Sequence, residues 1–334
     1  MPPAPCHRLS PPARALRALP LLLICAACEG RQSALDPAGE DAAVLLTLFT
    51  VMLIGAVILW LAMNGMFYGF TRVHRSQISK TTANSIVIGG GILLPTLLIG
   101  ALLGWGLSIL PDHQKPGDGL RIRVIGEQWW WRVEYWPEGA DTPVISANEI
   151  RLPAGQRTEF TLTSDRVIHS FWIPALGGKM DMFPGRETTL SLKPEKPGVY
   201  RGQCAELCGA SHAWMAFEAV VMPPGEFDAW LEQEAAGAQP AEGTEEGRDI
   251  FFREGCAACH TIRGTQAQGQ VGPDLTHVGS RHSLGAGRLG VTMEEFAAFV
   301  THTEDLKPEV RMPAYDHLSE DERAALAAYL KGLE

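Results

Sequence analysis

The sequence predicts a multidomain protein that has a transmembrane helical hairpin, an all-β domain and a small all-α domain. Two long apolar blocks stand before residue 111, and the rest of the 334-residue chain has a water-soluble composition. Residues 120–222 contain short runs rich in Val, Ile, Thr and aromatic residues between Pro, Gly and Asp clusters, which is typical of an antiparallel sandwich or barrel. Polar residues 232–243 then predict a flexible linker, and residues 244–334 a third domain.

The first 27 residues have the order of a secretory signal peptide, with arginines ahead of a short apolar run. Small residues directly before Cys28 resemble a bacterial lipoprotein cleavage site, which would make Cys28 the lipidated residue. Ordinary cleavage, with Cys28 incidental, is the alternative. Either reading places the start of the mature chain outside the cytoplasm.

The hairpin is predicted over residues 42–110, with spans at about 44–69 and 86–110. Each span is long enough to cross a hydrocarbon core of roughly 30 Å. Neither contains Asp, Glu, Lys or Arg, so both are expected to be anchors rather than parts of a proton pathway. Arg72, His74, Arg75 and Lys80 lie between them, and the positive-inside rule places this loop in the cytoplasm.

The formal net charge of −10 argues against a nucleic-acid partner, because binding to phosphates needs a basic surface. An acidic surface suits a basic protein partner better.

The densest chemistry of the all-β domain lies between Cys204 and Met215, where two thiols, the imidazole of His212 and a thioether fall within twelve residues. Thiolate and thioether ligands select copper or another soft metal over magnesium or calcium. One electron-transfer copper usually needs a single Cys, so the second thiol exceeds the needs of one ion. A Cys204–Cys208 disulfide and a structural zinc site are the alternatives, and neither would use Met215.

The run Cys-x-Glu-x-Cys-Gly-x-x-His-x-x-Met, preceded by residues 165–172 and 183–186, resembles subunit II of cytochrome c oxidase. The resemblance implies a cupredoxin barrel over residues 120–226 and the binuclear copper centre CuA. Its ligands would be two bridging thiolates, two imidazoles, a weak axial thioether and a backbone carbonyl. Cys204 and Cys208 would be the thiolates, His169 and His212 the imidazoles, and Met215 the thioether. Glu206 would supply the backbone carbonyl. The side chain of Glu206 also resembles the family's magnesium ligand at the interface with subunit I.

Residues 125–135 resemble the aromatic stretch beside CuA, in which the first Trp takes up electrons from cytochrome c. Trp129 holds that position here. The chain departs from the pattern at Glu127, where the family usually has His, and at Trp130, where it has Tyr. Packing of the three tryptophans as core and rim is the alternative, above all for Trp130 and Trp131.

The third domain opens with Cys256-Ala-Ala-Cys259-His260, the C-x-x-C-H motif of covalent haem c attachment, in which the His binds iron. Residues 272–275 and 311–314 resemble the haem-edge loop and axial-methionine loop of a class I cytochrome c domain, which implies Met312 as the sixth ligand. Met293 is the competing ligand, but it begins a helix. Thr292 and Ser319 each start a predicted capping box.

The remaining histidines of this domain, His277, His282, His302 and His317, are expected to be exposed polar residues without a role. The closing helix should cover the haem with Leu326, Tyr329 and Leu330, which fall on one face.

Together the resemblances imply the electron-accepting subunit of a haem–copper terminal oxidase in the bacterial inner membrane, with both cofactor domains on the periplasmic side. A cytochrome c or cytochrome bc complex would reduce haem c, and CuA would pass electrons to subunit I for dioxygen reduction coupled to proton translocation. Subunit III is a further expected partner. The alternatives are a quinol oxidase subunit II, nitrous oxide reductase, and a free-standing electron carrier or copper-delivery protein.

Overall fold

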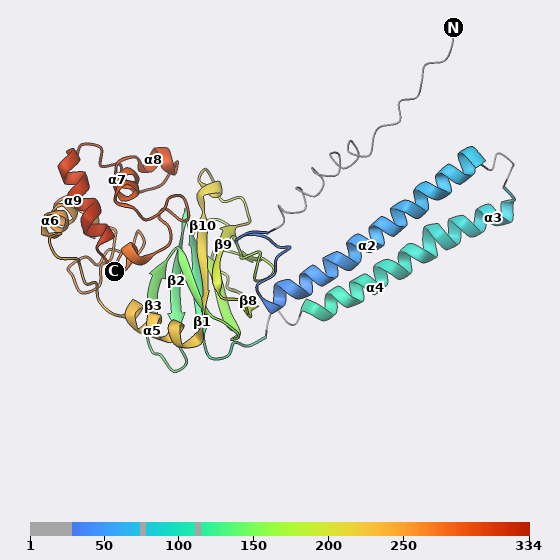
Figure 1. The fold of residues 1–334 in the computed structure, drawn as a ribbon, viewed down its shortest axis with the longest axis horizontal. Coiled ribbons are helices and arrows are strands. Elements are labelled where there is room, and N and C mark those ends of the chain that lie inside the picture. The colour runs from blue at the N-terminus through green and yellow to red at the C-terminus, as the bar shows by residue number, and fades with distance from the viewer. Residues whose placement is uncertain (1–28, 74–77, 111–114) are drawn as a thin grey trace, which may run out of the picture.

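The computed structural model describes residues 29–73, 78–110 and 115–334. The expected signal peptide, Cys28, His74 and Arg75 lie outside the described residues. A long helical hairpin extends from a globular part formed by a β domain and a C-terminal helical domain (Figure 1). The β domain comprises β1–β10 and α5, and the helical domain comprises α6–α9.

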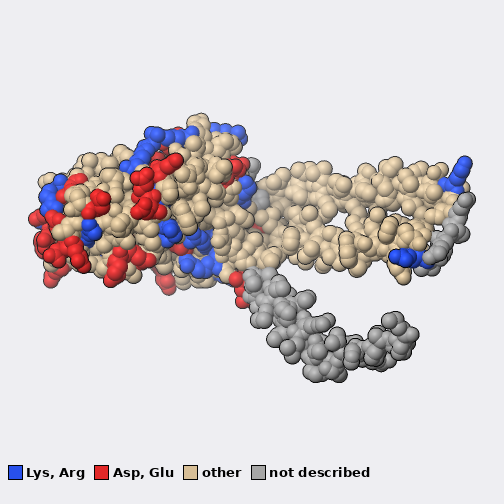
Figure 2. All heavy atoms as spheres, turned by 90° about the horizontal axis from the view of Figure 1, so that it is seen from above, with Lys and Arg blue, Asp and Glu red and all other residues tan. Residues whose placement is uncertain are grey.

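The hairpin consists of two helical arms whose charged residues lie only at their ends (Figure 2). The first arm is α2 (Glu40–Tyr68) with the π-helical turn η2 (Gly69–Val73), and the second joins α3 (Lys80–Ser85), η3 (Ile86–Leu93) and α4 (Leu94–Ile109). Segments of 33 and 30 residues are long and apolar enough to cross a membrane. Phe67 and Leu97 are 70% and 71% exposed, so their apolar surface needs lipid or another chain to cover it.

The first arm is tied to the β domain at its start. Asp41 is buried and accepts hydrogen bonds from Arg157 Nη1 at 3.1 Å and from the amide of Lys193 at 2.9 Å. Ala38 and Ala42 donate their amides to the carbonyls of Ala175 and Leu176. Charge pairing and backbone bonds therefore hold the start of the membrane arm against the sheet.

Two five-stranded sheets form the β domain, in the orders β3-β2-β1-β5-β8 and β4-β10-β9-β6-β7. The strands are β1 (Arg121–Glu127), β2 (Trp130–Trp136), β3 (Val144–Ala147), β4 (Glu149–Pro153), β5 (Thr158–Ser164), β6 (His169–Trp172), β7 (Met180–Met182), β8 (Thr188–Leu192), β9 (Gly198–Cys204) and β10 (Ala216–Met222). Phe160 and Leu162 are fully buried whereas Glu159 and Thr161 are partly exposed, which confirms the expected alternation in this part of β5. Phe171 and Phe217 stack at 4.9 Å in the core, and Trp131 packs edge-on against both.

Helix α5 (Pro224–Ala235) includes residues 232–235, which the composition assigned to the linker. These residues are helical because α5 packs on the sheet: Phe227 and Glu234 are buried, and the ring of Trp230 lies 5.2 Å from that of Tyr135.

The helical domain contains α6 (Glu245–Arg253), η6 (Cys256–Ala258), η7 (Val278–Ser280), α7 (Met293–Thr301), α8 (Thr303–Leu306) and α9 (Glu320–Lys331). Both predicted capping boxes are confirmed, because the side chains of Thr292 and Ser319 accept from the amides three residues later and the two glutamates bond back. The apolar face of α9 is buried as expected. The interior of the helical domain still contains a large cavity.

Candidate functional site

All six residues of the expected copper ligand set meet at one end of the second sheet. Cys204 ends β9, and His169 starts the neighbouring strand β6. The chain then loops through Cys208 to the short helical turn η5 (His212–Trp214) and returns with Met215 directly before β10. Strand pairing explains the arrangement: Phe171 pairs with Cys204 across β6 and β9, and the Cys204 amide donates to the Met215 carbonyl at 2.9 Å.

Each thiol has one imidazole beside it. Cys204 Sγ lies 3.6 Å from His169 Nδ1, and Cys208 Sγ lies 3.5 Å from His212 Nδ1. The two sulfurs are 3.8 Å apart, and Met215 Sδ lies 3.8 Å from Cys208 Sγ. The set is therefore nearly symmetric about the two thiols.

The geometry argues against a disulfide, because bonded sulfurs lie about 2.05 Å apart and these are separated by 3.8 Å. The hydrogen-bonded contact with Cys208 lowers the pKa of Cys204 to about 3, so one thiolate is already favoured. Thiolate is the form that binds metal. The backbone carbonyl of Glu206 lies 3.1 Å from Cys204 Sγ, while the Glu206 side chain is exposed at the surface.

A glycine makes room for the ligand His169. Gly126 lies in β1, and a Cβ atom there would be 2.8 Å from Cδ2 of the imidazole. The ring is fully buried between this backbone and Trp131, so its orientation is fixed by close packing.

Trp129 lies directly against the segment from Cys204 to Met215, which we call the thiol loop. Its indole Nε1 donates to the carbonyl of Cys208 at 3.0 Å, and the Gln128 amide donates to the same oxygen at 3.0 Å. The side chain is only 5% exposed, because the helical domain covers it. Trp131 is core and fully buried, whereas Trp130 lies partly exposed under the guanidinium of Arg132, at 4.8 Å.

The helical domain lines most of a cavity that is partly open to solvent. Three of its lining residues, Cys256, Cys259 and His260, belong to the C-x-x-C-H motif, and Met312 lines it as well. His260 Nδ1 lies 2.8 Å from the carbonyl of Pro273, which leaves Nε2 free to bind a metal. Burial lowers the pKa of His260 and so favours its neutral, ligating form.

Met293 is 37% exposed on α7 and is absent from the residues that line the cavity. Gly272 lets the chain pass close to the proximal imidazole, since a Cβ atom there would lie 2.5 Å from Cε1 of His260. The residues thus fit a planar, largely apolar group held by two thioether bonds and bound on its iron by one imidazole.

The β domain supplies one wall of this cavity, through Glu127, Gln128, Trp129 and Trp130. Trp129 therefore touches both sites: its ring faces the cavity of the helical domain, and its indole N–H bonds the thiol loop of the β domain. Trp129 is therefore a residue that the two candidate redox sites share.

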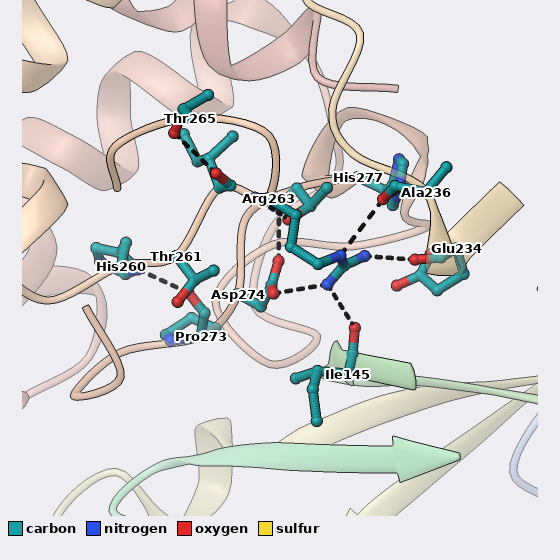
Figure 3. A network of polar contacts seen from close by, with 12 residues as sticks. Ile145, Glu234, Ala236, His260, Thr261, Arg263, Thr265, Pro273, Asp274 and His277 are labelled. Carbon is teal, nitrogen blue, oxygen red and sulfur yellow. Dashed lines mark hydrogen bonds and ion pairs between the residues drawn. The ribbon is translucent and has the colours of Figure 1, made fainter. Parts of the chain in front are cut away.

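Several buried polar residues fix the two domains together. Arg263 of the helical domain ion-pairs with Asp274 at 2.7 Å and donates to the carbonyls of Ile145, Glu234 and Ala236 (Figure 3). These carbonyls lie in β3, in α5 and at the start of the linker, so the linker is held against both domains.

A second contact pairs His282 with the buried carboxylate of Glu149 at 3.0 Å. His282 is exposed as expected, but its bond to Glu149 was not anticipated. His277 was also expected at the surface and is 4% exposed, with its Nε2 3.3 Å from the carbonyl of Ala236. Sequence reasoning missed the burial of His277 and the partner of His282, because a single histidine in a loop carries no local signal of either.

Lys307 is a third residue that no motif indicated. It is 2% exposed and contacts both domains beside the thiol loop. Lysines are almost never fully buried without partners, so nothing in its sequence context could have revealed this.

The comparisons with known proteins agree with the two sites. Residues 120–222 match the family described as "Cytochrome C oxidase subunit II, periplasmic domain", and residues 244–334 match the family "Cytochrome c". A protein named "Cytochrome c oxidase subunit 2" from Alkalihalophilus pseudofirmus is 32% identical, over 94% of this chain and 95% of its own. A protein of the same name from Bacillus subtilis is 30% identical, over 90% of this chain and 92% of its own.

Among solved structures, the periplasmic domain of subunit II of cytochrome oxidase from Bradyrhizobium japonicum is 31% identical, with a TM-score of 0.31. It covers 36% of this chain and 95% of that chain. The matched domains imply copper and haem as cofactors, and other oxidase subunits as partners. With two apolar helices and a periplasmic-type domain, the protein is a membrane-anchored component of a haem–copper oxidase. The chain belongs to the cytochrome c oxidase subunit II family and carries a cytochrome c domain at its C-terminal end.

Proposed function

We propose that this chain passes electrons from a c-type cytochrome, through a covalently bound haem c and a binuclear CuA centre, to subunit I, where dioxygen is reduced and protons are translocated. The observation that carries the proposal is the position of Trp129, which lines the haem cavity and donates to the Cys208 carbonyl in the thiol loop. Haem c and CuA, when bound, supply one-electron redox chemistry.

The residues of the copper site would have distinct tasks. Cys204 and Cys208 would hold the two coppers through their thiolates, His169 and His212 through their imidazoles, and Met215 more weakly through its thioether. The symmetric thiol–imidazole distances support this assignment. A rigid, buried ligand set limits the reorganisation that accompanies electron transfer.

In the helical domain, Cys256 and Cys259 would hold haem c covalently, and His260 and Met312 would bind its iron. The lining of the cavity supports Met312, and the exposure of Met293 speaks against it as a ligand. His and Met ligation raises the potential of haem iron. Met312→Ala should therefore lower the haem midpoint potential in a redox titration, while Met293→Ala should leave it unchanged; the reverse result would move the ligand to Met293.

The fused haem domain would also decide where electrons arrive. Because Trp129 is covered by the helical domain, an external donor would reduce haem c rather than dock at the copper site. A tethered donor at high effective concentration removes the need for docking at every turnover.

We further propose that the hairpin crosses the bacterial inner membrane twice, with its basic tip near Arg72 and Lys80 in the cytoplasm (Figure 2). The exposed carboxylate of Glu206 would meet subunit I and could share a magnesium ion there. Subunit III would complete the complex.

The test is to mix the purified complex with a reduced c-type cytochrome and follow two signals, the visible band of haem c and the near-infrared band of CuA. Haem reduction should come first and copper reduction second. Cys204→Ser should abolish the near-infrared band and leave the haem c band. A persistent near-infrared band in that variant, or no co-purifying haem-containing subunit I after gentle extraction, would refute the proposal.

A further inference from the structure

Lys307 reaches from the helical domain to two loops of the β domain. It follows α8 and is 2% exposed. Its Nζ donates to three carbonyls, those of Trp129 at 2.6 Å, Trp214 at 2.9 Å and Gly285 at 2.9 Å. The first two belong to the β domain, and the third belongs to the helical domain.

Both β-domain acceptors are next to the copper site. Trp129 bonds the Cys208 carbonyl through its indole, and Trp214 immediately precedes Met215 in the ligand loop. Lys307 also lines the haem cavity. The Lys307 side chain therefore lines the haem pocket and also bonds the backbone carbonyls of Trp129 and Trp214 beside the copper site.

Neighbouring contacts reinforce this point of attachment. The hydroxyl of the buried Ser211 donates to the carbonyl of Pro308 at 2.7 Å. The guanidinium of Arg288 lies over the ring of Trp214 at 3.9 Å. The amide of Ala216 donates to the carbonyl of Ala286 at 2.9 Å, which links the start of β10 to the helical domain.

The burial of Lys307 is costly, because a buried ammonium loses its hydration. Burial accordingly lowers its pKa to about 7. An ammonium group has three donors and no acceptor, and three carbonyls surround this one, so its hydrogen-bonding capacity is filled. A methionine of similar length would fill the space without that cost, so packing alone does not account for a lysine here.

We propose that Lys307 is a positioning residue that fixes the helical domain, and with it the haem pocket, against the Trp129 and Trp214 loops of the copper site. The inference rests on the proposed function, in which one electron leaves ferrous haem c and reduces CuA. Lys307 itself neither binds metal nor carries the electron. It keeps the haem pocket and Trp129 in one fixed relation.

The test uses the full-length chain in its purified complex, with Lys307→Met as the variant and Lys331→Met as the matched control. The ammonium of Lys331 donates to the carbonyl of Gly279 and to the carboxylate of Glu334, and both partners lie in the helical domain. Hydrogen exchange at the Ala216 amide reports docking directly, because that amide bonds the other domain. We expect exchange at least tenfold faster in Lys307→Met and unchanged in Lys331→Met, with the haem c and near-infrared bands of both variants intact.

Electron transfer provides a second readout. After photochemical reduction of haem c, copper reduction should be at least tenfold slower in Lys307→Met. It should also slow further as glycerol raises the viscosity, since the domains must first find each other. Wild-type transfer should not depend on viscosity.

Each outcome is informative. Wild-type protein that reduces haem c but never copper would refute the proposed function itself. Normal transfer in the wild type, with unchanged Ala216 exchange and unchanged transfer in Lys307→Met, would overturn only the positioning role. If Lys307→Met does not incorporate haem, Lys307→Gln takes its place; faster exchange in that variant supports the proposal, and wild-type exchange rejects it.

Discussion

Replacing Gly126 by alanine should disturb the copper site through His169 alone. The added Cβ would lie 2.8 Å from Cδ2 and 2.9 Å from Cγ of the imidazole. Non-bonded carbon atoms pack at about 3.5–4.0 Å, so the ring or the strand must move by roughly 0.7 Å. The ring is fully buried and lies against Trp131, which leaves it little space to move.

A shift of that size exceeds the roughly 0.5 Å within which a functional constellation has to be held. His169 Nδ1 is 3.6 Å from Cys204 Sγ, and movement of the ring would change this relation directly. Overpacking in a core costs about 1–3 kcal/mol, and disturbed support of a ligand lowers metal affinity about 10–100-fold. Gly126→Ala should therefore lose copper while the haem domain stays loaded.

The assay is the ratio of copper to haem by elemental analysis, together with the near-infrared absorbance normalised to the haem c band. Gly225→Ala is the matched control, because a Cβ at Gly225 in α5 has nothing within 4 Å. A full near-infrared band and a normal copper content in Gly126→Ala would show that the strand yields at no cost and that this steric reasoning is wrong.

Three further predictions concern the contacts around this site. Trp129→Phe removes the N–H that bonds the Cys208 carbonyl, and should slow haem-to-copper transfer at least tenfold in flash photolysis, with both optical bands retained. Asp41→Ala leaves the buried guanidinium of Arg157 with only the more distant carboxylate of Glu40, at 3.7 Å, and should lower the free energy of unfolding by about 3 kcal/mol; a urea midpoint equal to that of the wild type would contradict this. The Glu149–His282 pair makes domain docking depend on pH. The hydrogen bond to Glu149 raises the pKa of His282. The stabilisation of docking by protonated His282 is therefore fully present below its ordinary pKa of 6.5 and is lost as the pH rises through the raised pKa. Burial alone would raise the pKa of Glu149, but the hydrogen bonds from His282 and the charge of Arg151 outweigh burial, and the net pKa is lowered. The stabilisation of docking by ionised Glu149 is therefore fully present above its ordinary pKa of 4.5 and is lost as the pH falls through the lowered pKa. Protection of the Ala216 amide from hydrogen exchange, taken relative to its intrinsic rate at each pH, should be greatest between these limits. His282→Gln should remove the loss of protection at alkaline pH; an unchanged pH profile of protection in that variant would exclude the pair as its cause.

The sequence alone determined the features that depend on neighbouring residues. The apolar arms follow from length and composition, and the two confirmed capping boxes follow from a spacing of three residues. The copper loop and the C-x-x-C-H motif each place most of their ligands within a short stretch of chain. Such patterns are visible because the chemistry they serve constrains residues that are close in sequence.

Only the tertiary structure decided how distant segments meet. Pairing of β6 with β9 brings His169 beside Cys204, and docking of the helical domain covers Trp129. The same docking buries Lys307 and pairs His282 with Glu149. A lone lysine or histidine in a loop has the same local sequence whether it is solvated or buried, because its burial is set by surfaces contributed from elsewhere in the chain. The candidate ligands could therefore be identified from the chain, whereas the contact that holds the two domains together required the fold.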